Sequence, residues 1–181
     1  MQFQFKIIPA QSIAIVVPLV KKMSKPSITE ALLLERFKEM VTQNYECIGV
    51  YDADELVGVS GLWFCTRHYS GRSVELDHVF IDDTYRNKGL GTQFINWIQD
   101  YVKSKGYEAI ELNAYIDNEP SQKFYERDGF QKLGYHFVKE IGKFKLDTSD
   151  SDSISYGVLF FSNTRALKGP LSVIFEPTTS K

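Results

Sequence analysis

The residues best suited to chemistry lie in the stretch Val79–Gly91, which reads VFIDDTYRNKGLG. This pattern predicts the end of a buried strand, a short polar turn, and an amphipathic helix that opens at Gly89-Leu90-Gly91. Backbone N–H groups at a helix start have no intrahelical acceptor and lie at the positive end of the helix dipole, so they attract anions. Two glycines let a phosphate approach the backbone, while Arg86 and Lys88 add positive charge. The stretch therefore predicts a phosphate site.

Two common phosphate-binding loops are excluded by their spacing. The Walker pattern requires Gly-Lys-Ser/Thr at its end, whereas Gly91 is followed by Thr92 and Gln93. The dinucleotide fingerprint would place its third glycine at Phe94. What remains is Arg-x-x-Gly-x-Gly after a hydrophobic strand, and the failed spacings disfavour a nucleotide phosphate binder.

The run Ile81–Gly91 resembles the acyl-CoA signature of the GCN5-related N-acetyltransferases (GNAT family), whose usual form is Val-x-Pro-x-Tyr-Arg-Gly-Lys-Gly-Ile-Gly. Asp83 replaces the proline and Asn87 replaces a glycine, but neither change removes a contact made by backbone amides. A second block, Asn118–Phe130, is similar to the family's Asn-x-x-Ala-x-x-Phe-Tyr-Glu-x-x-Gly-Phe segment. It follows the first block by one helix and one strand, as in the family. The resemblance extends over residues 3–138.

The resemblance implies an N-acetyltransferase that moves an acetyl group from acetyl-CoA to a primary amine by direct attack in a ternary complex. It implies that backbone amides of the turn hold the pyrophosphate. It also implies that the pantetheine arm runs beside the preceding strand end, in the gap where that strand parts from Leu112–Tyr115. A backbone N–H of that strand would then face the thioester carbonyl. The expected acetyl-CoA-binding residues are Val79, Phe80, Ile81, Arg86, Asn87, Lys88, Gly89, Leu90, Gly91, Thr92, Asn118, Phe124 and Tyr125.

Tyr125 is the candidate acid of this reaction, because a phenol of pKa about 10 keeps its proton at neutral pH and can give it to a departing thiolate. The acceptor ammonium must lose a proton before it attacks, and Glu75 or Asp77 could take that proton directly or through water. His78 is a less favoured base, more simply explained as a packed or hydrogen-bonded histidine. Strand alternation puts it on the opposite face from both carboxylates, unless a bulge near Val79 breaks the alternation.

Hydrophobic periodicity predicts the elements that must position these residues. Their order indicates an α/β domain with a mixed, mostly antiparallel central sheet and helices on both faces, which the resemblance identifies with the GNAT (acyl-CoA N-acyltransferase) fold. We expect strands at 2–8, 47–52, 56–65, 73–81, 107–114 and 130–138, and helices at 11–23 with a bend at Pro18, at 30–42 after a Thr29 cap, at 91–105, and from an Asn118 cap to Asp128-Gly129.

Composition narrows the class of protein. The chain has 181 residues, of which 43% are hydrophobic and 24% charged, with a formal net charge of -2, so a single globular domain is expected and nucleic acid is not expected as the main partner. Residues 12–20 are apolar, but Pro18 interrupts them and they are too short to span a bilayer. With no secretion signal visible, we expect a cytoplasmic protein without a membrane partner. Cys47 and Cys65 are expected to be free thiols, and no metal is expected.

The acetyltransferase domain is predicted over residues 1–140 and a C-terminal extension over 141–181. The extension begins with a Ser- and Asp-rich stretch typical of a linker. Its apolar runs at 156–161 and 171–175 are compatible with an extra strand pair, docking on the domain, or self-association, so a homodimer is left open. An alternative function is a non-catalytic acetyl-CoA-binding sensor or interaction module, which would not need a proton donor such as Tyr125. The expected partner is a small-molecule or peptide amine acceptor, whose identity does not follow from the sequence.

Overall fold

The computed structural model describes residues 2–139 and 141–142, so most of the predicted C-terminal extension lies outside the described residues. Within them the strands form a sheet in the order β1-β2-β3-β4-β5. Neighbouring strands are antiparallel except β4 and β5, which are parallel, and this confirms the predicted mixed sheet. The elements are β1 Gln4–Ile8, the 3-10 helix η1 Ala10–Val16, α1 Val17–Lys21, α2 Glu30–Met40, β2 Tyr45–Asp52, β3 Glu55–Arg67, β4 Gly71–Ile81, the 3-10 helix η2 Asp83–Tyr85, α3 Leu90–Ser104, β5 Ala109–Leu112 and α4 Glu119–Arg127.

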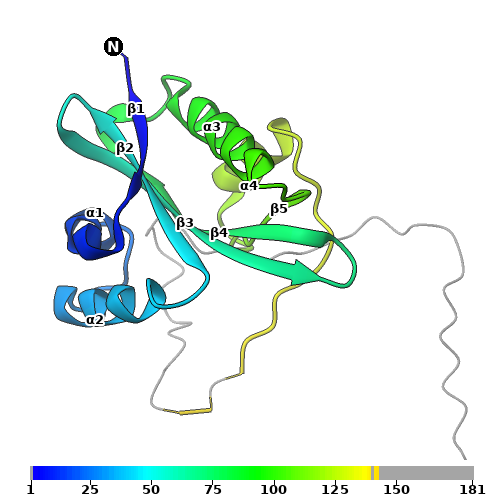
Figure 1. Ribbon diagram of the computed structural model, residues 1–181, viewed down its shortest axis with the longest axis horizontal. Helices are drawn as coiled ribbons and strands as arrows, with labels where there is room; N and C mark the ends of the chain where they lie inside the picture. The colour runs from blue at the N-terminus through cyan, green and yellow to red at the C-terminus, as the bar shows by residue number, and fades with distance from the viewer. Residues whose placement is uncertain (1, 140, 143–181) are drawn as a thin grey trace, which may run out of the picture.

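Helices cover both faces of the sheet, as predicted. In Figure 1, α1 and α2 lie on one side of the strands while α3 and α4 lie on the other. A hydrophobic cluster that includes Val16, Phe37 and Val59 fills the α1–α2 side. Another cluster, which includes Phe94 and Ile98 of α3, fills the opposite side. The sheet is therefore the middle layer between apolar surfaces.

Local sequence signals account for the helix ends. The Thr29 hydroxyl accepts a hydrogen bond from the Leu32 N–H at 3.2 Å, which is the predicted cap of α2. Pro18 lies in the first turn of α1, where its missing N–H costs no hydrogen bond. Gly106 follows the end of α3 with φ 74°, a left-handed conformation that favours glycine.

A bulge interrupts β4 at the position where the sequence left the alternation open. Val59 of β3 pairs with Phe80, but Gly61 pairs with Asp77, so β4 carries one extra residue between these pairs. His78 has φ 39°, which is unusual for a residue other than glycine. Beyond the bulge Phe80 belongs to the cluster on the α1–α2 side, whereas Val79 packs against the α3 side.

The sheet splits between β4 and β5. Their parallel pairing runs from Ser73 and Ala109 to Leu76 and Leu112. In the described residues no β5 partner follows for the remainder of β4, from Asp77 to Ile81. β5 is therefore shorter than the predicted strand 107–114, and its pairing with β4 ends next to the bulge.

The predicted strand 130–138 is wrong, because this segment is irregular. Its alternating apolar residues suggested a strand, but Leu133 and Phe137 are 79% and 89% exposed. Alternation favours a strand only when a neighbouring strand supplies hydrogen bonds and a surface to pack on.

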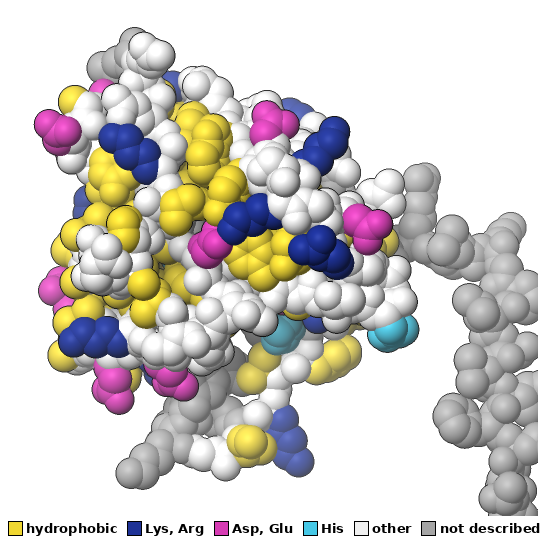
Figure 2. Space-filling view, viewed as in Figure 1, with side chains coloured by type: hydrophobic (Ala, Val, Ile, Leu, Met, Phe, Trp, Pro, Cys, Tyr) yellow, Lys and Arg dark blue, Asp and Glu magenta, His cyan; other side chains and the backbone are white. Residues whose placement is uncertain are grey.

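Figure 2 shows hydrophobic side chains gathered in the region where β1 lies beside α3. Between β1 and α3, Phe5 stacks on Phe94 with 5.7 Å between ring centroids and contacts Trp97 at 6.0 Å. On this face Lys and Arg side chains are interspersed with Asp and Glu side chains. Among the described residues no helix combines the length and hydrophobicity that crossing a membrane requires.

Candidate active site

The predicted phosphate turn connects β4 to α3 and is exposed to solvent. Asn87 and Gly89 both have left-handed backbone, with φ 60° and 77°, and residues 87–89 are exposed. Left-handed residues in such a turn direct N–H groups toward one side, where they form an anion-binding concavity. The first N–H groups of α3, which follow this turn directly, have no helical acceptor. A Cβ at Gly89 would meet no atom within 4 Å, so the space beside this residue is open.

Arg86 and Lys88, the cations expected beside the phosphate site, also form hydrogen bonds within the turn. Arg86 Nε donates to the carbonyl of Ile81 at 2.9 Å, and its guanidinium lies 2.7 Å from the Asp83 carboxylate. Lys88 Nζ donates to the carbonyl of Thr84 at 2.8 Å. Arg86 and Lys88 therefore stabilise the turn and place positive charge beside its amides.

Gly91 joins the phosphate turn to the second motif. A Cβ at this position would lie 3.2 Å from the Phe124 ring, so the glycine makes room for that ring. Phe124 belongs to α4, which begins at the predicted Asn118 cap, where Oδ1 accepts from the Ser121 N–H at 3.2 Å. The next residue, Tyr125, contacts the Phe124 ring at a centroid distance of 5.2 Å. The close approach of the Phe124 ring to Gly91 fixes α4 against the start of α3.

A cavity of about 350 Å³ lies at the split between β4 and β5. It brings together the residues predicted to act as acid and base, although they come from β4 and from α4. The side chains that line it are Trp63, Glu75, Leu76, Asp77, His78, Val79, Asn113, Ser121, Tyr125 and His136.

Tyr125 is buried in the wall of this cavity, with 7% of its surface exposed. Its ring packs edge-on against Phe130 at 5.5 Å between centroids. Burial, and then the nearby Asp128 carboxylate, raise the pKa of Tyr125 above its ordinary value. The phenol therefore keeps its proton at neutral pH, as a general acid must before it acts.

Glu75 is held on both carboxylate oxygens. Arg67 donates to Oε2 at 2.6 Å, and Asn113 donates to Oε1 at 2.5 Å. Arg67 also lies 3.0 Å from Glu111 of β5. Glu75 therefore takes part in an ionic network that links the β3–β4 hairpin to β5.

Asp77 and His78 form a partly buried pair beside the cavity. His78 Nδ1 lies 3.4 Å from Asp77 Oδ2, which also accepts from the Trp63 indole at 3.2 Å. Burial alone would raise the pKa of Asp77, but the charge of His78 and hydrogen bonds hold it below its usual range. Burial alone would lower the pKa of His78, but Asp77 raises it to about 9. At neutral pH the pair is an ion pair.

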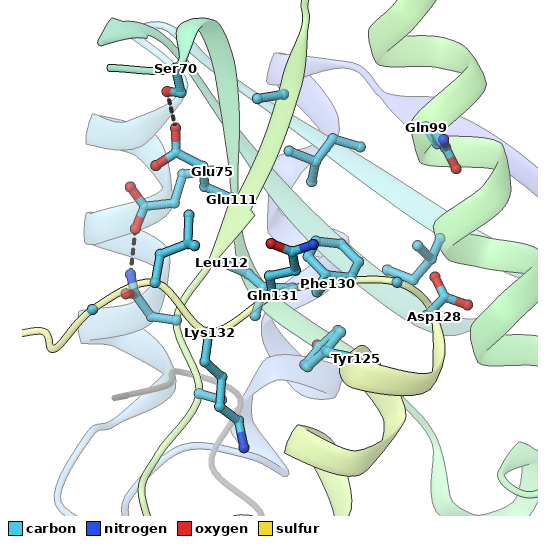
Figure 3. A pocket seen from close by; sticks show the side chains of 18 of the residues that line it. Ser70, Glu75, Gln99, Glu111, Leu112, Tyr125, Asp128, Phe130, Gln131 and Lys132 are labelled. Carbon is cyan, nitrogen blue, oxygen red and sulfur yellow. Dashed lines mark hydrogen bonds between the residues drawn. The ribbon is translucent and has the colours of Figure 1, made fainter. Parts of the chain in front are cut away.

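A larger cavity of about 1160 Å³ borders β5, α3 and the segment after α4. Figure 3 shows Ser70, Glu75 and Glu111 grouped on one side of it and Tyr125 on the α4 side. Ser70 donates to Glu111 at 2.8 Å. Because neighbouring side chains hydrogen-bond the carboxylates of Glu75 and Glu111, these two residues hold the strands together. Tyr125 borders this cavity as well as the smaller one.

The residues that hold Glu75, Arg67 and Asn113, were not predicted from the sequence. Arg67 could have been found, because the pairing of Trp63 with Glu75 puts Arg67 on the same face of the hairpin. Asn113 gave no such signal, since its contact with Glu75 depends on where the parallel strands stop pairing. Strand alternation without a bulge predicts His78 on the opposite face from Asp77, whereas the bulge brings the two side chains together.

Comparison with known proteins agrees with this geometry. The model of the acetyltransferase (GNAT) family matches residues 19–130, which is more than half of the chain and includes the phosphate turn and α4. The aminoglycoside N-acetyltransferase AAC(6')-Iy, solved in complex with CoA, aligns with a TM-score of 0.66 at 16% identity, over 77% of this chain and 95% of that one. This likeness confirms the predicted fold.

Curated relatives match shorter stretches. The spermine/spermidine N(1)-acetyltransferase of Bacillus subtilis (strain 168) is 34% identical over 95 residues, or 50% of this chain and 62% of that protein. The probable N-acetyltransferase 14 of Xenopus tropicalis is 28% identical over 102 residues, or 53% of this chain and 48% of that protein. The match covers 26% of the length of other relatives, among them an uncharacterised N-acetyltransferase of Methanocaldococcus jannaschii.

Proposed function

Because the chain belongs to the acetyltransferase (GNAT) family, we propose that it transfers an acetyl group from acetyl-CoA to a primary amine. The observation that carries this proposal is the split of the sheet after Leu76 and Leu112. The phosphate turn lies at the end of the open part of β4, and Tyr125 lines the cavity at the split. A long ligand with a diphosphate at one end and a reactive group at the other fits this order of features.

The turn would hold the pyrophosphate of acetyl-CoA through the backbone amides of residues 87–92. The open edge of β4 would pair with the amide groups of the pantetheine arm, because unpaired strand edges bind extended chains through their backbone. Val79, Phe80 and Ile81 form this edge. Acetyl-CoA would supply an activated thioester to the cavity. Side chains of the protein would then remove a proton from the amine and donate one to the departing sulfur.

The substrate ammonium loses one proton before it attacks and a second as the amide forms. The first is released to water, and the second returns Tyr125 to its protonated form after the phenol has given its proton to the departing sulfur. The amine nitrogen forms a bond to the thioester carbon, and the carbon–sulfur bond breaks. Tyr125 donates its proton to the sulfur, and a backbone N–H at the bulge, at Val79 or Phe80, hydrogen-bonds the carbonyl oxygen as negative charge develops. One such donor contributes on the order of 3 kcal/mol.

Asp77 is the better candidate to accept the proton of the substrate ammonium. Glu75 is bonded to Arg67 and Asn113 through separate oxygens, whereas the side chains of Trp63 and His78 both approach Oδ2 of Asp77. The lowered pKa of Asp77 keeps it ionised at neutral pH. Because such a carboxylate holds a proton only weakly, water carries the proton onward.

Tyr125 favours an enzyme over a non-catalytic acetyl-CoA sensor. A sensor needs the phosphate turn, but it has no use for a buried phenol in the cavity that would receive the thioester. Burial keeps this phenol protonated.

An amine panel tests the proposed function. Thiol release from acetyl-CoA is followed with a polyamine, a lysine peptide, an amino sugar and an amino acid; the polyamine is included because of the Bacillus subtilis relative. A thermal shift in acetyl-CoA, CoA and ATP accompanies it, since a ligand at 100 times its dissociation constant adds about 2.7 kcal/mol of stability. We expect acetyl-CoA and CoA to stabilise the protein and at least one amine to release thiol. Stabilisation by ATP alone would reject the proposal, and acetyl-CoA binding without turnover would favour a sensor.

A further inference from the structure

We propose that His78 is a positioning residue for acetyl transfer: its ring, held between Asp77 and Tyr45, maintains the β4 bulge that decides which backbone N–H groups face the split. This inference rests on the proposed function, because those N–H groups matter where a thioester carbonyl meets them. His78 lies on the α1–α2 side of the sheet, behind the edge that would bind the pantetheine arm.

The backbone at His78 needs support from its surroundings. A φ of 39° at a residue with a Cβ is strained, and such conformations persist only where neighbouring groups enforce them. A regular strand would pair Gly61 with a residue one position later in β4 than Asp77. Loss of the bulge would therefore exchange the faces of Val79 and Phe80 and reverse the directions of their N–H groups.

The ring of His78 is enclosed by several elements. Its Nε2 lies 3.0 Å from the Tyr45 hydroxyl of β2, and its Nδ1 lies 3.4 Å from Asp77. The Phe37 ring of α2 meets it edge-on at 5.2 Å between centroids. A Cβ at Gly61 of β3 would lie 2.4 Å from its Cε1, so this glycine provides the space that the ring occupies.

The charge of the ring strengthens this arrangement. A charged imidazole donates from both nitrogens, and here each nitrogen faces an oxygen. The titratable groups around it are Asp77 on β4 with Tyr45 and Cys47 on β2, and the groups that share its cavity are Glu75, Tyr125 and His136. Asp77 outweighs burial and keeps the ring charged up to about pH 9. Above that pH one nitrogen stops donating and the support weakens.

The kinetic test uses His78→Asn, because asparagine tolerates left-handed backbone but cannot carry the charge. We expect kcat to fall by about tenfold to a hundredfold, as for a misplaced reactive group, with a much smaller change in KM for acetyl-CoA. In the parent protein kcat at saturating amine should decline as the pH rises through about 9, and the variant should lack this decline. His68→Asn is the matched control, because His68 is exposed at the end of the hairpin, and it should retain the parent profile.

A second readout does not depend on turnover. The backbone amide NMR signals of Val79 and Phe80 should titrate with a midpoint near pH 9 in the parent protein and should not do so in His78→Asn. A parent kcat profile that persists in His78→Asn overturns the inference, and so do amide signals that do not titrate in the parent. A parent protein that acetylates no amine overturns the proposed function, and the amide signals then decide the role of His78 alone. If His78→Asn does not fold, the amide signals of the parent protein decide the role of His78.

Discussion

Tyr125 carries the proton that the proposed reaction must deliver to sulfur. Its burial raises the pKa of the phenol, which by itself makes the phenol a weaker acid. In the proposed reaction the departing thiolate would occupy the same cavity, so burial there would raise the pKa of the thiol as well. The two effects oppose each other, and the proton transfer remains close to balanced.

Replacing Tyr125 with phenylalanine should lower kcat by about a hundredfold or more, because a general acid contributes at least that much. The ring and its packing against Phe124 and Phe130 remain, so the affinity for acetyl-CoA should change little. Tyr101→Phe is the matched control, since it removes a phenol that bonds to Glu46 away from the cavity. Thiol release at saturating acetyl-CoA measures the effect, and equal rates for Tyr125→Phe and the parent would remove the acid role.

Side-chain partnerships were the least predictable part of the candidate site. The sequence identified Glu75, Asp77 and Tyr125 as candidates, and the structure places all three on one cavity. The sequence did not predict that Arg67 holds Glu75, or that His78 pairs with Asp77. These contacts depend on hairpin register and on one extra residue in β4, and neither leaves a mark in the composition of the strand.

Among the elements, the turn between β4 and α3 has the most demanding backbone. Gly89 has φ 77° at the N-cap of α3, where an L-residue is strained. The same conformation recurs at Gly106, φ 74°, at the opposite end of that helix. The two glycines therefore impose similar backbone requirements, but Gly89 alone belongs to the proposed phosphate site.

Gly89→Ala and Gly106→Ala separate strain from ligand binding. Each should lower the free energy of unfolding by about 1 kcal/mol, because alanine resists left-handed backbone. A Cβ at Gly106 meets the terminal Nη1 of Arg72 at 3.1 Å, a flexible group that can move. Gly89→Ala should also raise the Kd for acetyl-CoA by about tenfold, equivalent to about 1.4 kcal/mol. Calorimetric titration checks this, and equal affinities in the two variants would contradict the assignment of the turn.

Most elements could be predicted from local sequence, because their signals are local. Thr29 and Asn118 cap the helices that they were expected to cap, and Gly106 follows the end of α3. The segment 130–138 failed because alternation describes the faces of a strand and does not show whether a partner is present. The shortened β5 has a similar cause, since the pattern of 107–114 continues beyond Leu112, the last residue of β5.

Across the whole molecule, the fold joins motifs that are distant in the sequence. The Phe124 ring rests on Gly91, so the second block supports the helix that the first block opens. The sheet separates after Leu76, and this single change in pairing leaves both an open strand edge and a cavity. Family resemblance implied this arrangement, but periodicity could not, because a strand that stops pairing has the same pattern as one that continues.

Amide hydrogen exchange with and without acetyl-CoA tests the central claim most directly. We expect acetyl-CoA to slow exchange in residues 79–81 and in residues 87–92, because the first segment would pair with the pantetheine arm and the second would donate to the diphosphate. CoA should protect both segments, and ATP should not protect residues 79–81. Protection elsewhere, with both segments unchanged while acetyl-CoA is bound, would contradict the account.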